Sequence, residues 1–241
     1  MIFHGFQKTT LLDYPGHVAA IAFVGGCNLR CPYCHNSGLV LNENELDTFS
    51  EEDVISFLRK RAGVIDGLCV SGGEPTLYRE LPDFIRRVKQ EGFLLKLDTN
   101  GTNPDMLRLL LEENLLDYVA MDVKASPEGY QQITGFTGVS YDTIRKSISL
   151  LLASDIDYEF RTTIVRELHN ADMIRGIAAE ITGCRRYYLQ NYKDSGDILI
   201  DVMAQDDMNC QAEPLLSSFD DEEAMKLLEA AREYVPETEL R

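Results

Sequence analysis

Short apolar runs of strand length alternate with amphipathic helical stretches along the whole chain. The apolar runs lie at 18–24, 67–70, 94–98, 117–123, 158–165 and 187–192. Several of them are apolar on both faces, which is typical of strands buried in a parallel sheet. The helical stretches begin at residues that favour helix starts: Ser50, Pro82, Asn103, Ser140, Asn170 and Asp220.

The succession of six β-then-α units indicates a parallel sheet with right-handed crossovers. Such units form either an open doubly wound sheet or a partial barrel, and in both of them ligands bind at the carboxyl ends of the strands. We expect these units over residues 1–193. An irregular acidic segment and a terminal helix, packed on the same domain, are expected over 194–241.

Unusual polar stretches follow or end the apolar runs. In chain order they are "GGCNLRCPYCHN" (25–36), "SGGEPT" (71–76), "DTNGT" (98–102), "MDVK" (121–124), Arg161, and Gln190 with Asn191. Parallel strands that follow one another carry their carboxyl ends to one rim. The sequence therefore predicts that these residues form a single site.

Composition and charge exclude several classes of partner. The chain has 241 residues and a formal charge of −17, which argues against a nucleic-acid backbone as the partner. Residues 194–241 hold 14 acidic and 3 basic residues, and thus −11 of that charge. This acidic surface either keeps the protein soluble or docks a basic partner. With no leader-like start and no apolar run of about 18 residues, we expect a soluble, cytoplasmic protein that binds no membrane.

Three of the six cysteines lie within eight residues, at Cys27, Cys31 and Cys34. Such clustering favours metal or redox chemistry over a disulfide framework. A thiol–disulfide exchanger, a covalent haem or a zinc site with His35 would each use part of the pattern. An iron–sulfur cluster suits all three thiolates, and three ligands for four irons leave one iron open to a substrate. The other cysteines lack this spacing, and we expect inert thiols at Cys69, Cys184 and Cys210.

The cysteine spacing, with Tyr33 before the last cysteine and Gly72-Gly73-Glu74-Pro75 after the next strand, resembles the radical S-adenosylmethionine (SAM) superfamily. Within it, "CNLRCPYCHN", "SGGEP", "DTNG" and "DVK" are similar to the glycyl-radical-enzyme activating enzymes. Residues 5–28, "GFQKTTLLDYPGHVAAIAFVGGCN", look most like the longer form of the anaerobic ribonucleoside-triphosphate reductase activating proteins. The resemblance covers residues 1–192 and implies a partial (β/α)6 TIM-type barrel. The acidic segment 194–219 departs from it.

The resemblance implies a [4Fe-4S] cluster and SAM as cofactors. The reduced cluster would cleave SAM to methionine and a 5′-deoxyadenosyl radical, which would take hydrogen from a glycine of anaerobic ribonucleoside-triphosphate reductase. The implied electron donor is a low-potential protein such as flavodoxin or ferredoxin. Alternative targets are pyruvate formate-lyase, another glycyl radical enzyme or a small molecule. The GGEP and DTNG loops disfavour a third reading, a non-catalytic electron carrier or structural zinc protein.

The resemblance also assigns roles at the cysteine loop and the glycine-rich loop. Cys27, Cys31 and Cys34 would hold three irons, and Tyr33 would lie against the adenine. Glycine lets backbone approach a ligand, and a carboxylate accepts hydrogen bonds from an ammonium. Gly72 and Gly73 are expected to let the backbone approach the ligand, and Glu74 is expected to accept hydrogen bonds from the methionyl ammonium. For His35 and Asn36, hydrogen bonds to cluster sulfur and a plain surface loop are equal alternatives. Structural or exposed positions are expected for His4, His17 and His169.

The strand-end residues would complete the SAM site. Asp98, Thr99 and Asp122, with the Ala120 backbone, match positions that surround SAM and a monovalent cation in related activating enzymes, since hard cations prefer oxygen ligands. Carboxylates that only cap the following loops are the alternative. Further SAM contacts are expected from Lys124, Arg161 and Gln190. Lys124 would face the SAM carboxylate, and a structural ion pair to Asp98 or Asp122 would explain Arg161 equally well.

Overall fold

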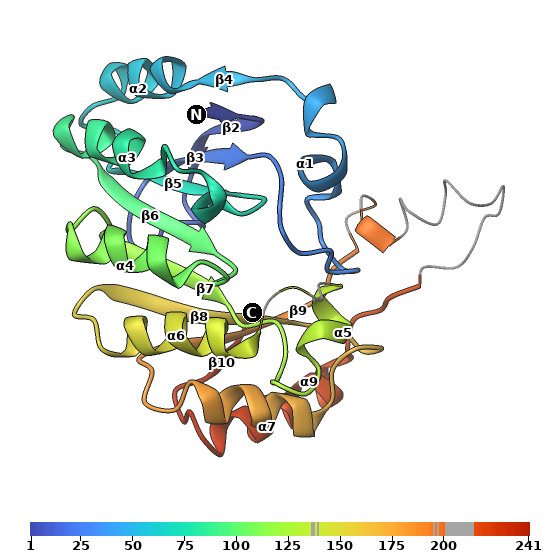
Figure 1. Ribbon diagram of the computed structural model, residues 1–241. Helices are drawn as coiled ribbons and strands as arrows, with labels where there is room; N and C mark the ends of the chain where they lie inside the picture. Colours follow the sequence, from blue (N-terminus) through green and yellow to red (C-terminus); the bar gives the residue numbers. More distant parts are fainter. Residues whose placement is uncertain (136–137, 139, 195, 197, 201–214) are drawn as a thin grey trace, which may run out of the picture.

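The computed structural model describes residues 1–135, 138, 140–194, 196, 198–200 and 215–241 (Figure 1). Its centre is a run of six strands in sequential order: β3 (Ala19–Val24), β5 (Gly67–Gly72), β6 (Leu94–Thr99), β7 (Tyr118–Asp122), β8 (Asp157–Ile164) and β9 (Tyr187–Asn191). Each neighbouring pair among them is parallel. Every one coincides with an apolar run of the sequence, so the predicted parallel α/β sheet is confirmed.

The sheet has an extra strand at each edge that the apolar pattern did not predict. The antiparallel strand β2 (Gly5–Thr10) pairs with β3, and the parallel strand β10 (Glu239–Leu240) pairs with β9. In the described residues these two strands are the ends of the eight-stranded order, so the sheet is a partial barrel and not a closed one. A separate antiparallel pair joins β1 (Ile2–Phe3) to β4 (Phe49–Ser50).

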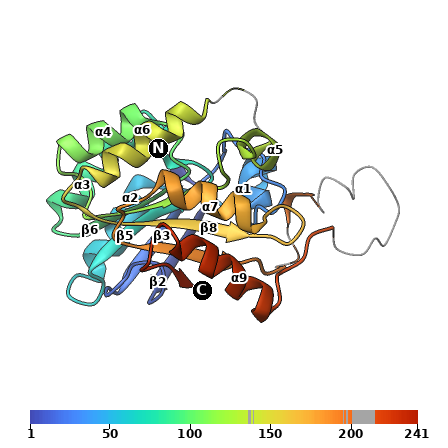
Figure 2. The same ribbon diagram turned by 90° about the horizontal axis from the view of Figure 1, so that it is seen from below.

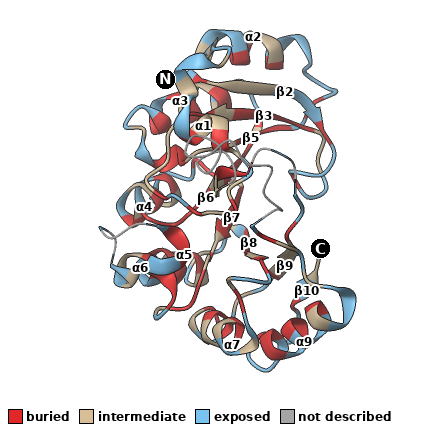
Figure 3. Cartoon of the chain, turned by 90° about the vertical axis from the view of Figure 1, so that its right-hand side faces the viewer, coloured by how far each residue is buried: buried red, intermediate tan, exposed pale blue. Residues whose placement is uncertain are grey.

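Five long helices connect the central strands and lie along the outer side of the curved sheet (Figure 3): α2 (Glu51–Lys60), α3 (Leu81–Gln90), α4 (Pro104–Glu112), α6 (Tyr141–Leu152) and α7 (Ala171–Glu180). Their starts agree with the sequence, since Ser50 forms a capping box with Asp53, and Asn103 and Asn170 each accept a backbone hydrogen bond. Among the described helices, none is long and apolar enough to cross a bilayer.

Shorter elements lie in the loops after the strands, where the site is expected. They are α1 (Ser37–Leu41) and the 3-10 turn η1 (Glu43–Glu45) after β3, the 3-10 turn η2 (Pro75–Leu77) after β5, and α5 (Tyr130–Thr134) after β7.

The terminal helix α9 (Asp221–Arg232) lies beside α7 (Figure 2). It begins at the expected Asp220, which forms a capping box with Glu223, and its buried Leu227 and Leu228 belong to the same apolar core as the sheet. An ion pair of 3.0 Å joins Arg175 of α7 to Glu233 just beyond α9. Much of the acidic segment, including Cys210, lies outside the described residues.

Candidate active site

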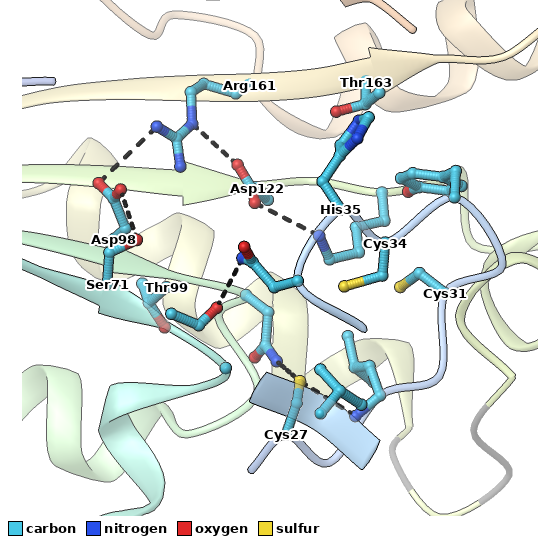
Figure 4. Close-up of a pocket in the computed structure, with 18 residues that line it drawn as sticks. Cys27, Cys31, Cys34, His35, Ser71, Asp98, Thr99, Asp122, Arg161 and Thr163 are labelled. Carbon is cyan, nitrogen blue, oxygen red and sulfur yellow. Dashed lines mark hydrogen bonds and ion pairs between the residues drawn. The ribbon is translucent and has the colours of Figure 1, made fainter. Parts of the chain in front are cut away.

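A pocket lies at the carboxyl ends of the central strands, where the sequence predicts a single site (Figure 4). The loop after β3, residues 25–36, brings the three clustered cysteines to it, and we call this loop the cysteine wall. Charged side chains of β6, β7 and β8 and of the residues that follow β7 form a second side: Asp98, Asp122, Lys124 and Arg161. With Lys96, which pairs with Asp98 but does not line the pocket, we call them the charged wall.

The thiols of the cysteine wall all contribute to the lining of the pocket. Burial raises the pKa of the Cys31 thiol to about 12 and also raises the pKa of the Cys27 thiol. A metal ligand must be a thiolate, so metal binding at these thiols releases protons. In the described part of the chain, no three His, Cys, Asp or Glu side chains are grouped closely enough to hold a single metal ion.

Backbone hydrogen bonds from other elements fix the cysteine wall. They run from Gly26 N to Leu39 O (2.8 Å), from Arg30 N to Thr134 O (2.8 Å), from Leu199 N to Cys34 O (3.1 Å) and from Ile200 N to Pro32 O (3.1 Å). The last two come from the start of the acidic segment, and Leu199 itself is buried. A role for this segment at the cysteines has no signal in the sequence, because it lies 165 residues beyond Cys34.

Tyr33 is buried in the cysteine wall, and its hydroxyl has no hydrogen-bond partner among the described residues. Its ring lies edge-on to His169 with centroids 6.1 Å apart. His169 Nδ1 accepts from Val165 N (3.1 Å), which leaves Nε2–H to donate to the Lys124 carbonyl (3.1 Å). Burial lowers the pKa of His169, in agreement with a neutral ring that supports Tyr33 and with the structural role predicted for this histidine.

Asparagine side chains connect the cysteine wall to neighbouring loops. Asn100 Nδ2 lies 3.7 Å from Cys27 Sγ and donates to Asn28 Oδ1 at 3.0 Å. Asn36, for which a contact to cluster sulfur and a surface loop were equal alternatives, donates to the Gly72 carbonyl at 3.1 Å. Sequence reasoning missed the sulfur contact of Asn100, although the DTNGT stretch contains this residue.

The glycines of the SGGEPT loop are required by the packing of the chain on itself. Gly72 has φ of +111°, and a Cβ there would lie 2.4 Å from the Val24 carbonyl oxygen. At Gly73 a Cβ would lie 1.8 Å from the Gly26 carbonyl oxygen. Both glycines line the pocket, but the close approach that excludes a side chain is to the end of β3 at Gly72 and to the cysteine wall at Gly73. The sequence suggested an approach to the ligand instead.

Glu74 occupies a different place from the one expected. Its side chain is fully buried and accepts hydrogen bonds from the Thr76 N–H and hydroxyl, from the Thr99 hydroxyl at 2.8 Å and from the Asn100 N–H at 2.7 Å. Burial raises the pKa of this carboxyl despite these donors. The carboxylate thus joins the SGGEPT and DTNGT loops behind the pocket, and it is not among the pocket-lining groups that an ammonium would contact.

The charged wall is a chain of ion pairs, which is the alternative that the sequence left open for Arg161. Arg161 Nε donates to Asp122 Oδ1 at 2.8 Å, and its Nη1 lies 3.7 Å from Asp98 Oδ1. Lys124 donates to Asp122 Oδ2 at 3.3 Å, and Lys96 contacts Asp98 Oδ1. Although burial opposes it, the neighbouring Arg161 and Lys124 charges lower the pKa of Asp122 to about 2.

Four further residues relate the strands to the pocket. Thr163 lines the pocket and was missed. Ser71, which belongs to the predicted SGGEPT stretch but was given no role, also lines the pocket, and its Oγ donates to Asp98 Oδ2 at 3.0 Å. Gln190 pairs in register with Thr163, so it lies on the same face of the sheet, but it does not line the pocket. Thr99 lines the pocket as expected while its hydroxyl bonds to Glu74.

The pocket fits the implied cofactors in its donor chemistry. Among the described residues, three cysteines and no fourth line the pocket, which matches a cluster with one open iron. Lys124, whose ammonium is held beside Asp122, offers a cation to a carboxylate. The Tyr33 hydroxyl, which has no partner in the described part of the chain, offers a donor to a polar ligand.

The chain is similar to proteins of known family. The profile of the radical SAM superfamily matches residues 21–179. Over 200 residues the chain is 34% identical to a protein of Methanocaldococcus jannaschii provisionally named a glycyl-radical enzyme activating enzyme, with 80% of this chain and 81% of that protein covered. Over 152 residues it is 31% identical to the pyruvate formate-lyase-activating enzyme of Clostridium pasteurianum, with 60% of this chain and 62% of that protein covered.

The fold also has relatives among solved structures. A domain of the pyruvate-formate lyase-activating enzyme of Bacteroides vulgatus superposes with a TM-score of 0.54 at 18% identity, covering 73% of this chain and 98% of that chain. At this identity the likeness supports the fold alone.

Proposed function

The chain belongs to the radical SAM superfamily and is therefore an enzyme that uses a [4Fe-4S] cluster and SAM, and from this premise we propose that it installs a glycyl radical on a partner enzyme. When bound, these cofactors supply the 5′-deoxyadenosyl radical that removes hydrogen from a glycine Cα. The protein binds and orients them.

The observation that carries the proposal is the meeting of two chemically different walls in one pocket. The cysteine wall offers three thiols, and the charged wall offers cations and carboxylates at the ends of β6, β7 and β8. A cluster alone would need only the thiols. A zwitterionic ligand with a carboxylate and an ammonium, such as the methionyl part of SAM, needs the charged wall as well.

Individual residues have proposed roles on this basis. Cys27, Cys31 and Cys34 hold three irons, and Tyr33 lies where an adenine would stack or hydrogen-bond. Lys124 pairs with the carboxylate of SAM, and Asp98 or Asp122 contacts its ammonium. The backbone of Gly72 and Gly73 forms the side of the pocket between the two walls.

The partner that we propose is anaerobic ribonucleoside-triphosphate reductase. Its support is the likeness of residues 5–28 to the longer activating proteins of that reductase. Flavodoxin or ferredoxin is the proposed electron donor. The similarity to the clostridial enzyme favours pyruvate formate-lyase as the second candidate partner, and a small-molecule substrate is the third.

Two measurements test the function. Protein purified without oxygen should contain about four irons per chain, and its reduction with SAM should yield methionine and 5′-deoxyadenosine. Mixing with the reductase or with pyruvate formate-lyase should then give a glycyl radical signal in electron paramagnetic resonance for one partner only. One zinc per chain without acid-labile sulfide would contradict the cofactor assignment, and product formation without any protein radical would favour a small-molecule substrate.

A further inference from the structure

The carboxylate of Asp98 already has protein partners on both oxygens. Its Oδ1 contacts the ammonium of Lys96 and lies 3.7 Å from Arg161 Nη1. Its Oδ2 accepts a hydrogen bond from Ser71 Oγ at 3.0 Å. Lys96 extends from β6 itself, two residues before Asp98, and its side chain is only 2% exposed.

Asp122 is satisfied in the same way. Its Oδ1 accepts from Arg161 Nε at 2.8 Å, and its Oδ2 accepts from Lys124 Nζ at 3.3 Å. The guanidinium of Arg161 therefore spans the two carboxylates, with one nitrogen on each (Figure 4). A planar guanidinium with several fixed N–H groups suits such a bridge better than a point charge.

Three protein cations thus face two carboxylates at the place where related enzymes were expected to hold a monovalent cation. An alkali ion between Asp98 and Asp122 would lie next to the Arg161 guanidinium, in a buried region where like charges repel strongly. The carboxylate oxygens that would ligate it are used by Lys96, Arg161 and Lys124. An alkali ion needs several free oxygens at once, and the residues present do not fit it. The ammonium of SAM needs only one remaining lone pair of a carboxylate oxygen.

We propose that Lys96 and Arg161 are built-in cations that take the place of the monovalent cation at this site. Lys96 is then a positioning residue, which holds Asp98 for SAM without itself lining the pocket. The proposal rests on SAM binding by the proposed enzyme and is independent of which partner receives the radical. It assigns a reason to a buried lysine that stands between two leucines in the sequence of β6.

The first experiment compares chloride salts of potassium, sodium and choline at one ionic strength, using the protein before cofactor loading. The thermal midpoint of the native protein should be the same in all three salts to within about 1 °C. The Lys96→Met variant removes the ammonium and keeps the chain length. In it, potassium or sodium should raise the midpoint by several degrees relative to choline, since an ion that binds only the folded state stabilises it.

The second experiment measures SAM affinity of the cluster-loaded protein in the same salts. The native affinity should vary by less than about twofold, whereas Lys96→Met should bind at least about tenfold more weakly in choline and recover in potassium or sodium. Lys96→Arg, which keeps the charge, should stay independent of the salt.

A matched control removes an ion pair away from the pocket. Lys89 of α3 pairs with Asp117 at 2.7 Å, and Lys89→Met should lower the midpoint without any preference for alkali ions. Potassium dependence of the native protein would overturn the proposal, and so would a Lys96→Met variant that is indifferent to the salts in both measurements. If the protein bound no SAM at all, the proposed function would fail, while the salt dependence of unfolding would still test the built-in cations.

Discussion

The two walls of the pocket differ in how many of their polar groups have bonding partners within the protein. On the charged wall, Asp98, Asp122 and Arg161 all have partners within the chain. On the cysteine wall, burial raises the pKa of the Cys31 thiol to about 12, and the Tyr33 hydroxyl has no partner among the described residues. One wall is preorganised, and the other is completed by what binds to it.

This difference separates the two tasks of the pocket. Fixed ion pairs orient a ligand without reorganisation at the moment of reaction, which is an efficient use of charge in a buried site. Metal ligands must instead lose protons to bind, so their site forms together with its cofactor. Damage to the cysteine wall should therefore remove the cluster, whereas damage to the charged wall should leave the cluster and impair SAM binding.

The largest expected effect is that of Cys31→Ala. Loss of one of three thiolates should reduce iron from about four per chain to less than one after reconstitution, because two ligands do not retain a cube of iron and sulfide. Iron and acid-labile sulfide assays measure this. A variant that kept its full iron content would contradict the assignment of the cluster to the cysteine wall, and with it the contrast between the two walls.

A smaller effect is expected from Arg161→Gln, which leaves Asp98 and Asp122 without their shared guanidinium. Removal of one partner from a buried ion pair costs about 3–5 kcal/mol, and discounted for the partial exposure of these side chains we expect about 2 kcal/mol. Urea unfolding measures the loss. SAM binding should also weaken by at least about tenfold.

The double variant Arg161→Gln with Asp122→Asn sharpens this test. Neutralising the carboxylate removes part of the uncompensated charge, so the two changes should destabilise the protein by less than the sum of their separate effects. Iron content should match that of the native protein in all three variants. Iron loss as large as in Cys31→Ala would mean that the two walls are not separable.

A third test concerns the hydrogen bonds from residues 199 and 200 to the cysteine wall. Leu199→Pro removes the N–H that donates to the Cys34 carbonyl, while Leu199→Ala keeps it and shortens the side chain. A net hydrogen bond is worth about 1 kcal/mol, so the proline variant should lose iron to a chelator about fivefold faster than the alanine variant. Equal rates in the two variants would show that this hydrogen bond does not stabilise the cysteine wall.

Much of the fold of this protein can be predicted from local sequence patterns. Apolar runs of strand length place β3 and β5 to β9, and caps such as Ser50 and Asn170 place the helices. Their succession then fixes where the loops meet, because parallel strands share one carboxyl end. The two-residue strand β10 was missed, since so short an edge strand has no periodicity of its own.

The site residues that were missed or misplaced depend on contacts between distant segments. Glu74 is buried by hydrogen bonds from the DTNGT loop, and Cys34 is bound by Leu199 of the acidic segment. Neither contact has a sequence signal. The contact of Lys96 with Asp98 did have a sequence signal. Residues two apart in a strand lie on the same face, so the lysine in the run "LLKLD" is within reach of Asp98.

The smallest expected effect compares two cysteines in the two regions. Cys69 lies in β5, fully buried, with its sulfur 3.8 Å from Lys96 Nζ beneath the charged wall, and burial raises the pKa of its thiol. Cys69→Ala should leave the iron content unchanged and cost about 1 kcal/mol of unfolding free energy, because a small buried side chain is lost. Cys31→Ala and Cys69→Ala remove the same thiol group. A difference in iron content between the two variants therefore reflects where the cysteine lies and not what kind of side chain was removed. Iron loss in both variants would place a cluster ligand on β5 and contradict the division between the two walls.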